Sequence, residues 1–233
     1  MTHPLITALD ETFRHVRNKD WPLNDRLRAI AQEVRNRSPE FADAVDTFVA
    51  RLEAARAGIG APQIGTPMPG FVMPDQDGNL VSLDDILDRG PAILAFHRGH
   101  WCPYCRLNMV GLAEIQNHLG DAQIYAISAE LQRYTRELRA ESGAQFPFLT
   151  DIDGGYALAT GLAIWVDEVM AAMISGAGWD IPGYQGGSAW VLPVPSVFIL
   201  DRSGIVRTRH VDPDYRRRME LDAIVAGVRA LAD

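Results

Sequence analysis

The chain is poor in cysteine and lysine, and it has no long hydrophobic run. Only two of its 233 residues are cysteine, and Lys19 is the only lysine among its 22 basic residues. The formal net charge is −8, so no nucleic-acid partner is expected, because nucleic-acid-binding proteins carry a basic surface. No stretch is long and apolar enough to cross a membrane, so no membrane partner is expected either.

The first residues, Met1 to Asp20, lack the apolar segment of a secretory signal and carry charges throughout. We therefore expect a cytoplasmic protein. In that compartment thiols are kept reduced, and a single Cys-x-x-Cys pair is more often catalytic than structural. The 47% hydrophobic composition is ordinary for a globular protein, so folding should not depend on a disulfide.

Both cysteines lie in the sequence Cys102-Pro103-Tyr104-Cys105, which follows an apolar run that begins at Ala92. This pattern predicts a buried strand, a short loop and a helix that begins at about Cys102. The free N–H groups and the positive dipole end of such a helix stabilise a thiolate. Thiol pKa values at such positions fall from about 8.5 to roughly 3.5–7.5. The i, i+3 spacing puts both cysteines on one face. We predict that Cys102 is a reactive thiolate and that Cys105 closes a disulfide onto it.

The residues before the motif favour this interpretation but leave alternatives open. Arg98, His97 and His100 could add positive potential around the thiolate. The same two histidines could instead complete a zinc site with the cysteines, although a structural site usually has a second Cys pair. The cysteines could also be buried and inert. A redox pair agrees best with the strand, loop and helix, and it needs neither a metal nor an organic cofactor.

Residues 1–60 are predicted to form a helical extension ahead of a domain at 61–233. Three apolar stripes with helical spacing predict three amphipathic helices; the stripes are Leu5, Leu9, Phe13 and Val16, then Leu23, Leu27, Ile30 and Val34, then Phe41, Val45, Phe48 and Leu52. Ser38 and Pro39 should begin the third helix, and Gly58 and Gly60 should end it. The stripes should pack on the main domain or on a second subunit.

The remainder alternates strand and helix patterns, which predicts an α/β fold with a central mixed sheet flanked by helices. Residues 123–128 should pair parallel to the strand before the cysteines. A hairpin is expected around Asp77-Gly78-Asn79. Further expectations are helix caps at Ser128 and Asp153, a helix from Ile164 to Ile174, a loop over 175–188, a strand over 194–201 with an antiparallel partner over 205–210, and a last helix over 215–231 begun by Asp212-Pro213-Asp214.

Three motifs carry a resemblance to a known family. Arg98–Arg106, Val194–Asp201 and Val211–Tyr215 resemble the bacterial peroxiredoxin-like branch of the AhpC/TSA (redoxin) family, within the thioredoxin-like superfamily. The resemblance covers about residues 65–233. It implies a thioredoxin-like fold and thiol peroxidase activity.

The resemblance also implies roles for single residues. Cys102 matches the peroxidatic cysteine and Cys105 the second cysteine of the thioredoxin motif. Pro195 matches the cis-proline that faces the cysteines. Arg98, His100 and Trp101 form the prefix that would activate the thiolate or position the substrate.

The chain departs from the standard peroxiredoxin pattern at three positions. Standard members carry proline and threonine where this chain has Ala95 and Gly99, and an arginine where it has Pro195. In those proteins the proline and threonine shape the peroxide pocket, and the arginine helps to activate the thiolate. Our hypothesis is that Arg98 supplies the missing positive charge.

Three functions are compatible with these residues. The first is a peroxidase that reduces hydrogen peroxide or organic hydroperoxides through a Cys102 sulfenic acid, resolved by Cys105 and recycled by thioredoxin or a similar dithiol. The second is a thioredoxin- or glutaredoxin-like thiol–disulfide oxidoreductase, which the Pro-Tyr dipeptide and Pro195 favour. The third is a non-enzymatic binding protein with a redox fold. A homodimer is expected from base rates alone.

Overall fold

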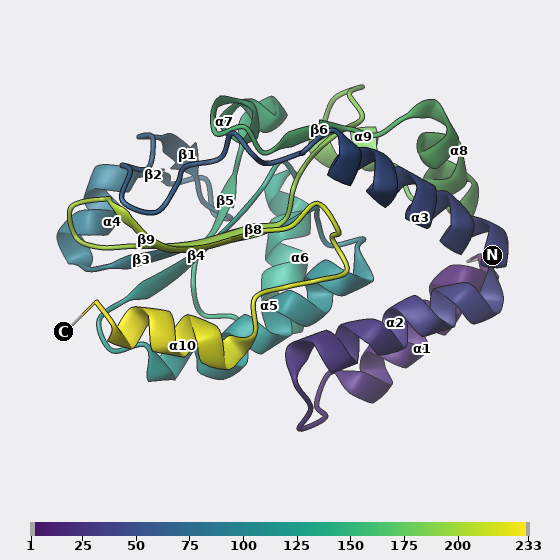
Figure 1. The fold of residues 1–233 in the computed structure, drawn as a ribbon, viewed down its shortest axis with the longest axis horizontal. Helices are drawn as coiled ribbons and strands as arrows, with labels where there is room; N and C mark the ends of the chain where they lie inside the picture. Colours follow the sequence, from purple (N-terminus) through teal and green to yellow (C-terminus); the bar gives the residue numbers. More distant parts are fainter. Residues whose placement is uncertain (1–2, 232–233) are drawn as a thin grey trace.

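The computed structural model describes residues 3–231, which are organised around a five-stranded mixed sheet (Figure 1). Its strands, in the spatial order β5-β4-β3-β8-β9, are β5 (Phe148–Thr150), β4 (Gln123–Ser128), β3 (Ala92–Phe96), β8 (Ser196–Leu200) and β9 (Val206–Val211). β4 runs parallel to β3 and β5, whereas β8 is antiparallel to both β3 and β9. The predicted mixed sheet and the parallel pairing of β3 and β4 are confirmed.

Strand β3 is central because its sequence is apolar on both faces. All five of its residues are buried. Ile93 and Ala95 pack with one hydrophobic cluster, which includes residues of α5, α6 and α10, while Leu94 and Phe96 pack with the other. A strand covered on both faces reads as a continuous apolar run, as this one does. The loop that carries the cysteines therefore begins at the carboxyl end of a buried strand, at one edge of the sheet.

The helices cover both faces of the sheet, and two small sheets complete the chain. The helical elements after residue 60 are α4 (Leu83–Arg89), α5 (Pro103–Ile115), the 3₁₀ turn η1 (Gln116–His118), α6 (Gln132–Ser142), η2 (Ile152–Gly154), α7 (Gly155–Ala159), α8 (Glu168–Ala177), α9 (Ile181–Gln185) and α10 (Leu221–Arg229). The predicted hairpin is confirmed as β1 (Val72–Pro74) with β2 (Leu80–Ser82), and β6 (Ala163–Trp165) pairs with β7 (Val191–Pro193). The chain has the thioredoxin-like α/β fold that its motifs implied.

The three predicted N-terminal helices are present as α1 (Pro4–Val16), α2 (Leu23–Arg37) and α3 (Pro39–Ala54). All twelve residues of the three apolar stripes are buried. α1 and α2 pack on α5, and α3 packs on α8, at the end of the molecule away from β1 and β2 (Figure 1). The division at residue 60 stays a prediction, and residues 1–2 and 232–233 at its outer ends lie outside the described residues.

Polar contacts tie the extension to the rest of the chain. Arg26, buried on α2, forms an ion pair with Glu114 of α5 at 2.6 Å. Glu220 accepts hydrogen bonds from the backbone N–H groups of Leu23 (2.8 Å) and Asn24 (3.1 Å), so a carboxylate from just before α10 caps the start of α2. Among residues 3–231, no helix combines the length and apolar character needed to cross a membrane.

Several predicted helix boundaries were wrong, because residues other than the expected ones begin or end these helices. α3 ends at Ala54, before the glycines, where Arg56 takes a positive φ of 53°. Ser128 does not cap a helix but lies in β4, and α6 begins at Gln132. Asp151, rather than Asp153, accepts the N–H groups at the start of α7, from Tyr156 (2.7 Å) and Ala157 (2.8 Å).

Three larger errors concern segments near the site. The helix predicted from Ile164 begins only at Glu168, since residues 163–165 form β6 and Asp167 caps the helix through the N–H of Met170. The predicted loop over 175–188 contains α9. The last helix begins at Leu221 and not after Asp212-Pro213-Asp214, so residues 212–220 form a non-helical segment. That segment reaches the cysteines, since Nη2 of its Arg218 lies 3.7 Å from the Sγ of Cys105.

Candidate active site

Cys102 lies where the loop after β3 meets α5. It is the N-cap residue of the helix, Pro103 occupies the first helical position, and the Cys102 carbonyl accepts the N–H of Arg106 at 3.0 Å. Proline costs nothing there because that N–H has no helical partner. The predicted helix start is therefore confirmed. Both Cys102 and Cys105 are free thiols with no exposed surface.

Arg98 contacts both sulfur atoms. Its side-chain Nη2 donates to the Sγ of Cys102 at 3.3 Å, and its backbone N–H donates to the Sγ of Cys105 at 3.4 Å. The guanidinium is held flat on the Tyr215 ring, with its Cζ atom 3.4 Å from the ring centroid. This cation–π contact fixes the arginine in the position where its charge acts on the sulfur.

Gly99 makes room for this arrangement. Its φ is +139°, and a Cβ atom there would lie 2.4 Å from Oε1 of Glu130 and 2.7 Å from Nε1 of Trp101. A side chain at this position would therefore displace both neighbours. The departure from the threonine of standard peroxiredoxins thus has a structural reason, because Glu130 and Trp101 occupy that space.

A second arginine, Arg218, lies beside Cys105, with Nη2 3.7 Å from its Sγ. It comes from the segment before α10, and its Nη1 donates to the carbonyl oxygens of Tyr215 and Arg217. Arg98 and Arg218 are 5% and 4% exposed. Within residues 3–231 neither pairs with a carboxylate, and the Nε atoms of both lack a partner. Two buried cations without a carboxylate favour a negative charge on the nearby sulfurs.

The pKa values of the two thiols are shifted in opposite directions. Burial opposes ionisation of Cys102, but a hydrogen bond from Cys105 and the charges of Arg98 and Arg218 outweigh it and hold its pKa well below the ordinary thiol value. Burial and the adjacent Cys102 thiolate raise the pKa of Cys105 well above that value. These opposite shifts favour a resting pair with a thiolate at Cys102 and a thiol at Cys105 that donates to it.

The two histidines of the loop lie in different surroundings, and His97 does not carry the charge that was expected of it. Burial lowers the pKa of His97 to about 3, so this side chain is neutral and adds no positive potential near the cysteines. His100 contacts Glu130, whose Oε1 lies 2.7 Å from its Nδ1 and whose Oε2 accepts its backbone N–H at 2.7 Å. Its ring stacks on Tyr134, with centroids 4.5 Å apart. His100 therefore anchors the cysteine loop through Glu130, which sequence reasoning missed.

The two remaining predicted site residues differ in outcome. Trp101 donates from Nε1 to the Arg98 carbonyl at 3.2 Å, and so braces the loop that carries Arg98. Pro195 is buried between β7 and β8, but the described residues contain no cis peptide bond, so the cis-proline implied by the resemblance is wrong. Residues 3–231 contain no cluster of three or more histidine, cysteine or acidic residues able to hold a metal ion.

One known protein family matches the region of the chain that contains the cysteines. The family model of the AhpC/TSA family matches residues 64–209, which include both cysteines, Arg98 and Glu130. The chain belongs to the AhpC/TSA family. Arg218 and the three N-terminal helices lie outside the matched region. Comparison of the sequence with curated proteins gave no match.

Solved structures with the same fold include peroxiredoxins of several bacteria. Peroxidoxin BcpB of Mycobacterium tuberculosis has a TM-score of 0.57 at 19% identity, with 73% of this chain and 98% of that chain covered. AhpC of Enterococcus faecalis has a TM-score of 0.55 at 17% identity, over 72% of this chain and 92% of that one. The bacterioferritin comigratory protein of Xanthomonas campestris has a TM-score of 0.54 at 14% identity, over 70% and 92%. At these identities the similarity shows the fold.

Proposed function

We propose that this member of the AhpC/TSA family is a thiol peroxidase, with Cys102 as the peroxidatic cysteine and Cys105 as the resolving cysteine. The observation that carries the proposal is the 3.3 Å contact between Arg98 and the Cys102 sulfur, at a guanidinium that pairs with no carboxylate of residues 3–231. Family membership and the peroxiredoxin-like fold support it. Alkyl peroxide reduction is described for the Xanthomonas campestris protein of the same fold.

The first step forms a bond between sulfur and oxygen. The Cys102 thiolate attacks the terminal oxygen of the hydroperoxide, the O–O bond breaks, and the leaving alkoxide or hydroxide takes up a proton as an alcohol or water. Cys102 becomes a sulfenic acid. Arg98, 3.3 Å from the sulfur, stabilises the negative charge while it moves from sulfur to the leaving oxygen.

The second step uses the changed charge around Cys105. Once Cys102 is an uncharged sulfenic acid, the thiolate that suppressed ionisation of Cys105 is gone, while Arg218 and the Arg98 N–H still face its sulfur at 3.7 and 3.4 Å. Cys105 then loses its proton, attacks the Cys102 sulfur and forms the disulfide. The hydroxide that leaves takes up a proton to become water. An external dithiol such as thioredoxin restores both thiols by exchange.

Stopped-flow tryptophan fluorescence tests the proposal, since Trp101 adjoins Cys102 and donates to the Arg98 carbonyl. Pre-reduced protein is mixed with hydrogen peroxide and with organic hydroperoxides, and Cys102→Ser serves as the control. We expect a fast change that depends on peroxide concentration and is absent from the control. A rate no higher than that of a free thiol would refute the peroxidase.

A thiol–disulfide oxidoreductase that uses the same pair is the alternative function. It requires a protein or glutathione disulfide to reach the sulfurs, which here have no exposed surface. Arg98 contacts both sulfurs and lies over the rings of Trp101 and Tyr215. This enclosure favours a hydroperoxide over a protein or glutathione disulfide as the substrate. If the protein reduces a glutathione mixed disulfide faster than it reduces any hydroperoxide, the oxidoreductase and not the peroxidase is its main function.

A further inference from the structure

A partly open, mainly apolar cavity lies between the N-terminal helices and the cysteine loop, and we call it the chamber. Its volume is about 310 Å³, at the lower end of the range of roughly 300–1,000 Å³ that is usual for small-molecule sites. Its apolar walls come from α2, α3 and α8; they include Val34, Phe41, Val45, Phe48, Met170 and Ile174. The extension thus forms a large part of the chamber wall.

The chamber ends at the reactive site. Arg98, Trp101 and Tyr215 line its inner end, and Arg98 also contacts the Cys102 sulfur. The sulfur itself is fully buried behind these side chains. A molecule in the chamber therefore places one end against the guanidinium that holds the thiolate, while the rest of it contacts hydrocarbon.

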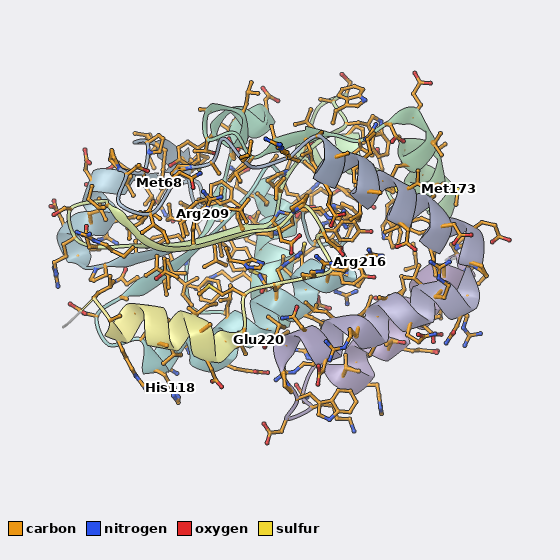
Figure 2. All side chains as sticks on the ribbon, in the orientation of Figure 1. Met68, His118, Met173, Arg209, Arg216 and Glu220 are labelled. Carbon is orange, nitrogen blue, oxygen red and sulfur yellow. The ribbon has the colours of Figure 1, made fainter. Side chains whose placement is uncertain are left out.

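Apart from Arg98, the arginines that line the chamber form ion pairs with carboxylates. Arg35 of α2 forms ion pairs with Asp43 and with Asp46, the latter at 2.5 Å. Arg216 pairs with Asp46 at 2.5 Å and with Asp214 at 2.8 Å. Figure 2 shows Arg216 on the segment before α10, on the side of the molecule where the N-terminal helices lie. Arg98 has no carboxylate partner within residues 3–231, but in the reduced protein its guanidinium faces the Cys102 sulfur at 3.3 Å and balances the thiolate, so the chamber offers an anionic ligand no unpaired cation.

We propose that the chamber binds the carbon skeleton of a bulky, uncharged organic hydroperoxide, and that α2 and α3 of the extension determine this specificity. This inference rests on the proposed peroxidase function and adds to it the substrate class and a role for the extension. The hydroperoxide group lies at the Arg98 end, and its reduction yields the corresponding alcohol and water once Cys105 has closed the disulfide. Hydrogen peroxide leaves the apolar walls uncovered, so it gains none of their binding energy.

The first arm of the test compares substrates of graded size. Hydrogen peroxide, tert-butyl hydroperoxide and cumene hydroperoxide are mixed with reduced protein, and kcat/KM is obtained for each. We expect kcat/KM to rise with the apolar bulk of the substrate, by roughly tenfold or more from hydrogen peroxide to cumene hydroperoxide. Equal values, or a preference for hydrogen peroxide, would overturn the specificity and leave the peroxidase function standing. No reaction with any hydroperoxide would instead overturn the peroxidase.

The second arm fills the chamber. Ala31 of α2 lines it, and Ala31→Leu adds bulk to its wall. Ala50→Leu is the matched control, because Ala50 is exposed on α3 and does not line the chamber. We expect Ala31→Leu to lower the ratio of kcat/KM for cumene hydroperoxide to that for hydrogen peroxide by roughly tenfold. Ala50→Leu should leave the ratio unchanged. An unchanged ratio in Ala31→Leu would contradict the proposal.

The third arm needs no turnover. The alcohol product of cumene hydroperoxide is titrated into Cys102→Ser protein, and tryptophan fluorescence is followed, since Trp101 and Trp179 both line the chamber. We expect saturable binding that is weakened in the Cys102→Ser protein that also carries Ala31→Leu, and retained with Ala50→Leu. Binding that is equal in both double variants would place the alcohol elsewhere and refute the chamber as its site.

Discussion

Removing the charge of Arg98 should make Cys102 a much weaker acid. Arg98→Met keeps an unbranched side chain of similar reach but removes the guanidinium, which donates to the Cys102 sulfur at 3.3 Å. A hydrogen bond to a charged group contributes about 1.5–3 kcal/mol. If this stabilisation of the thiolate is lost, the acidity of the thiol falls roughly 10- to 150-fold. The pKa of Cys102 therefore rises, although Arg218 and the Cys105 thiol still lower it.

The pH dependence of thiolate absorbance in the ultraviolet measures this change, and the rate of alkylation by iodoacetamide provides a second readout. The pKa of Cys105 lies well above its ordinary value, so the first step on raising the pH belongs to Cys102. The pKa of Cys102 in Arg98→Lys should lie between those in the wild type and in Arg98→Met, since lysine keeps the charge but lacks the planar guanidinium. Arg202→Met, which removes an exposed arginine paired with Asp121, is the control. A titration midpoint in Arg98→Met equal to that of the wild type would show that the guanidinium does not stabilise the thiolate.

Three further predictions follow from the same site. Arg218→Met should slow disulfide formation at least several-fold and prolong the sulfenic acid, as measured by dimedone trapping; Arg217→Met, at an exposed neighbour, should not, and equal trapping in both variants would contradict the role of Arg218. Cys105→Ser should turn over once and stop as a sulfenic acid, and continued thioredoxin-dependent turnover would show that Cys105 is not the resolving thiol. His97 should destabilise the protein in acid: its folded-state pKa of about 3 lies below the unfolded value of about 6.5, so the free energy of unfolding falls as the pH drops through that interval. His97→Phe should reduce this fall between about pH 7 and about pH 5 in urea titrations, and an equally steep fall would contradict it.

The parts of the site that the sequence revealed are those fixed by local signals. The apolar run of β3, the proline after Cys102 and the i, i+3 spacing together specify strand, loop and helix start over a few residues, and the structure agrees at each point. The three helical stripes of the extension are equally local. The closeness of Arg98 to Cys102 also follows from their short separation along the chain, because only three residues lie between them.

The parts of the site that we did not predict from the sequence depend on contacts between segments that are distant along the chain. Arg218 is 113 residues from Cys105, and no pattern distinguishes it from Arg216 and Arg217, which face carboxylates instead. Glu130 carried a usable signal, since it follows β4, which runs parallel to β3 and ends at the same edge of the sheet. The chamber could not be predicted at all, because it depends on where α2 and α3 lie relative to the cysteine loop.

The two arginines also bear on how the oxidised protein is recycled. In the reduced state Arg98 and Arg218 share one anion, the Cys102 thiolate, whereas in the disulfide both sulfurs are neutral and two buried cations remain without a counter-charge. The reduced form is therefore stabilised relative to the oxidised one, which makes a disulfide more oxidising and easier for a dithiol to reduce. Equilibration with glutathione buffers measures the effect, and both Arg98→Met and Arg218→Met should shift the midpoint toward more reducing potentials. A midpoint unchanged in both variants would mean that other groups set the potential, and that the arginines serve only the steps in which Cys102 and Cys105 act as nucleophiles.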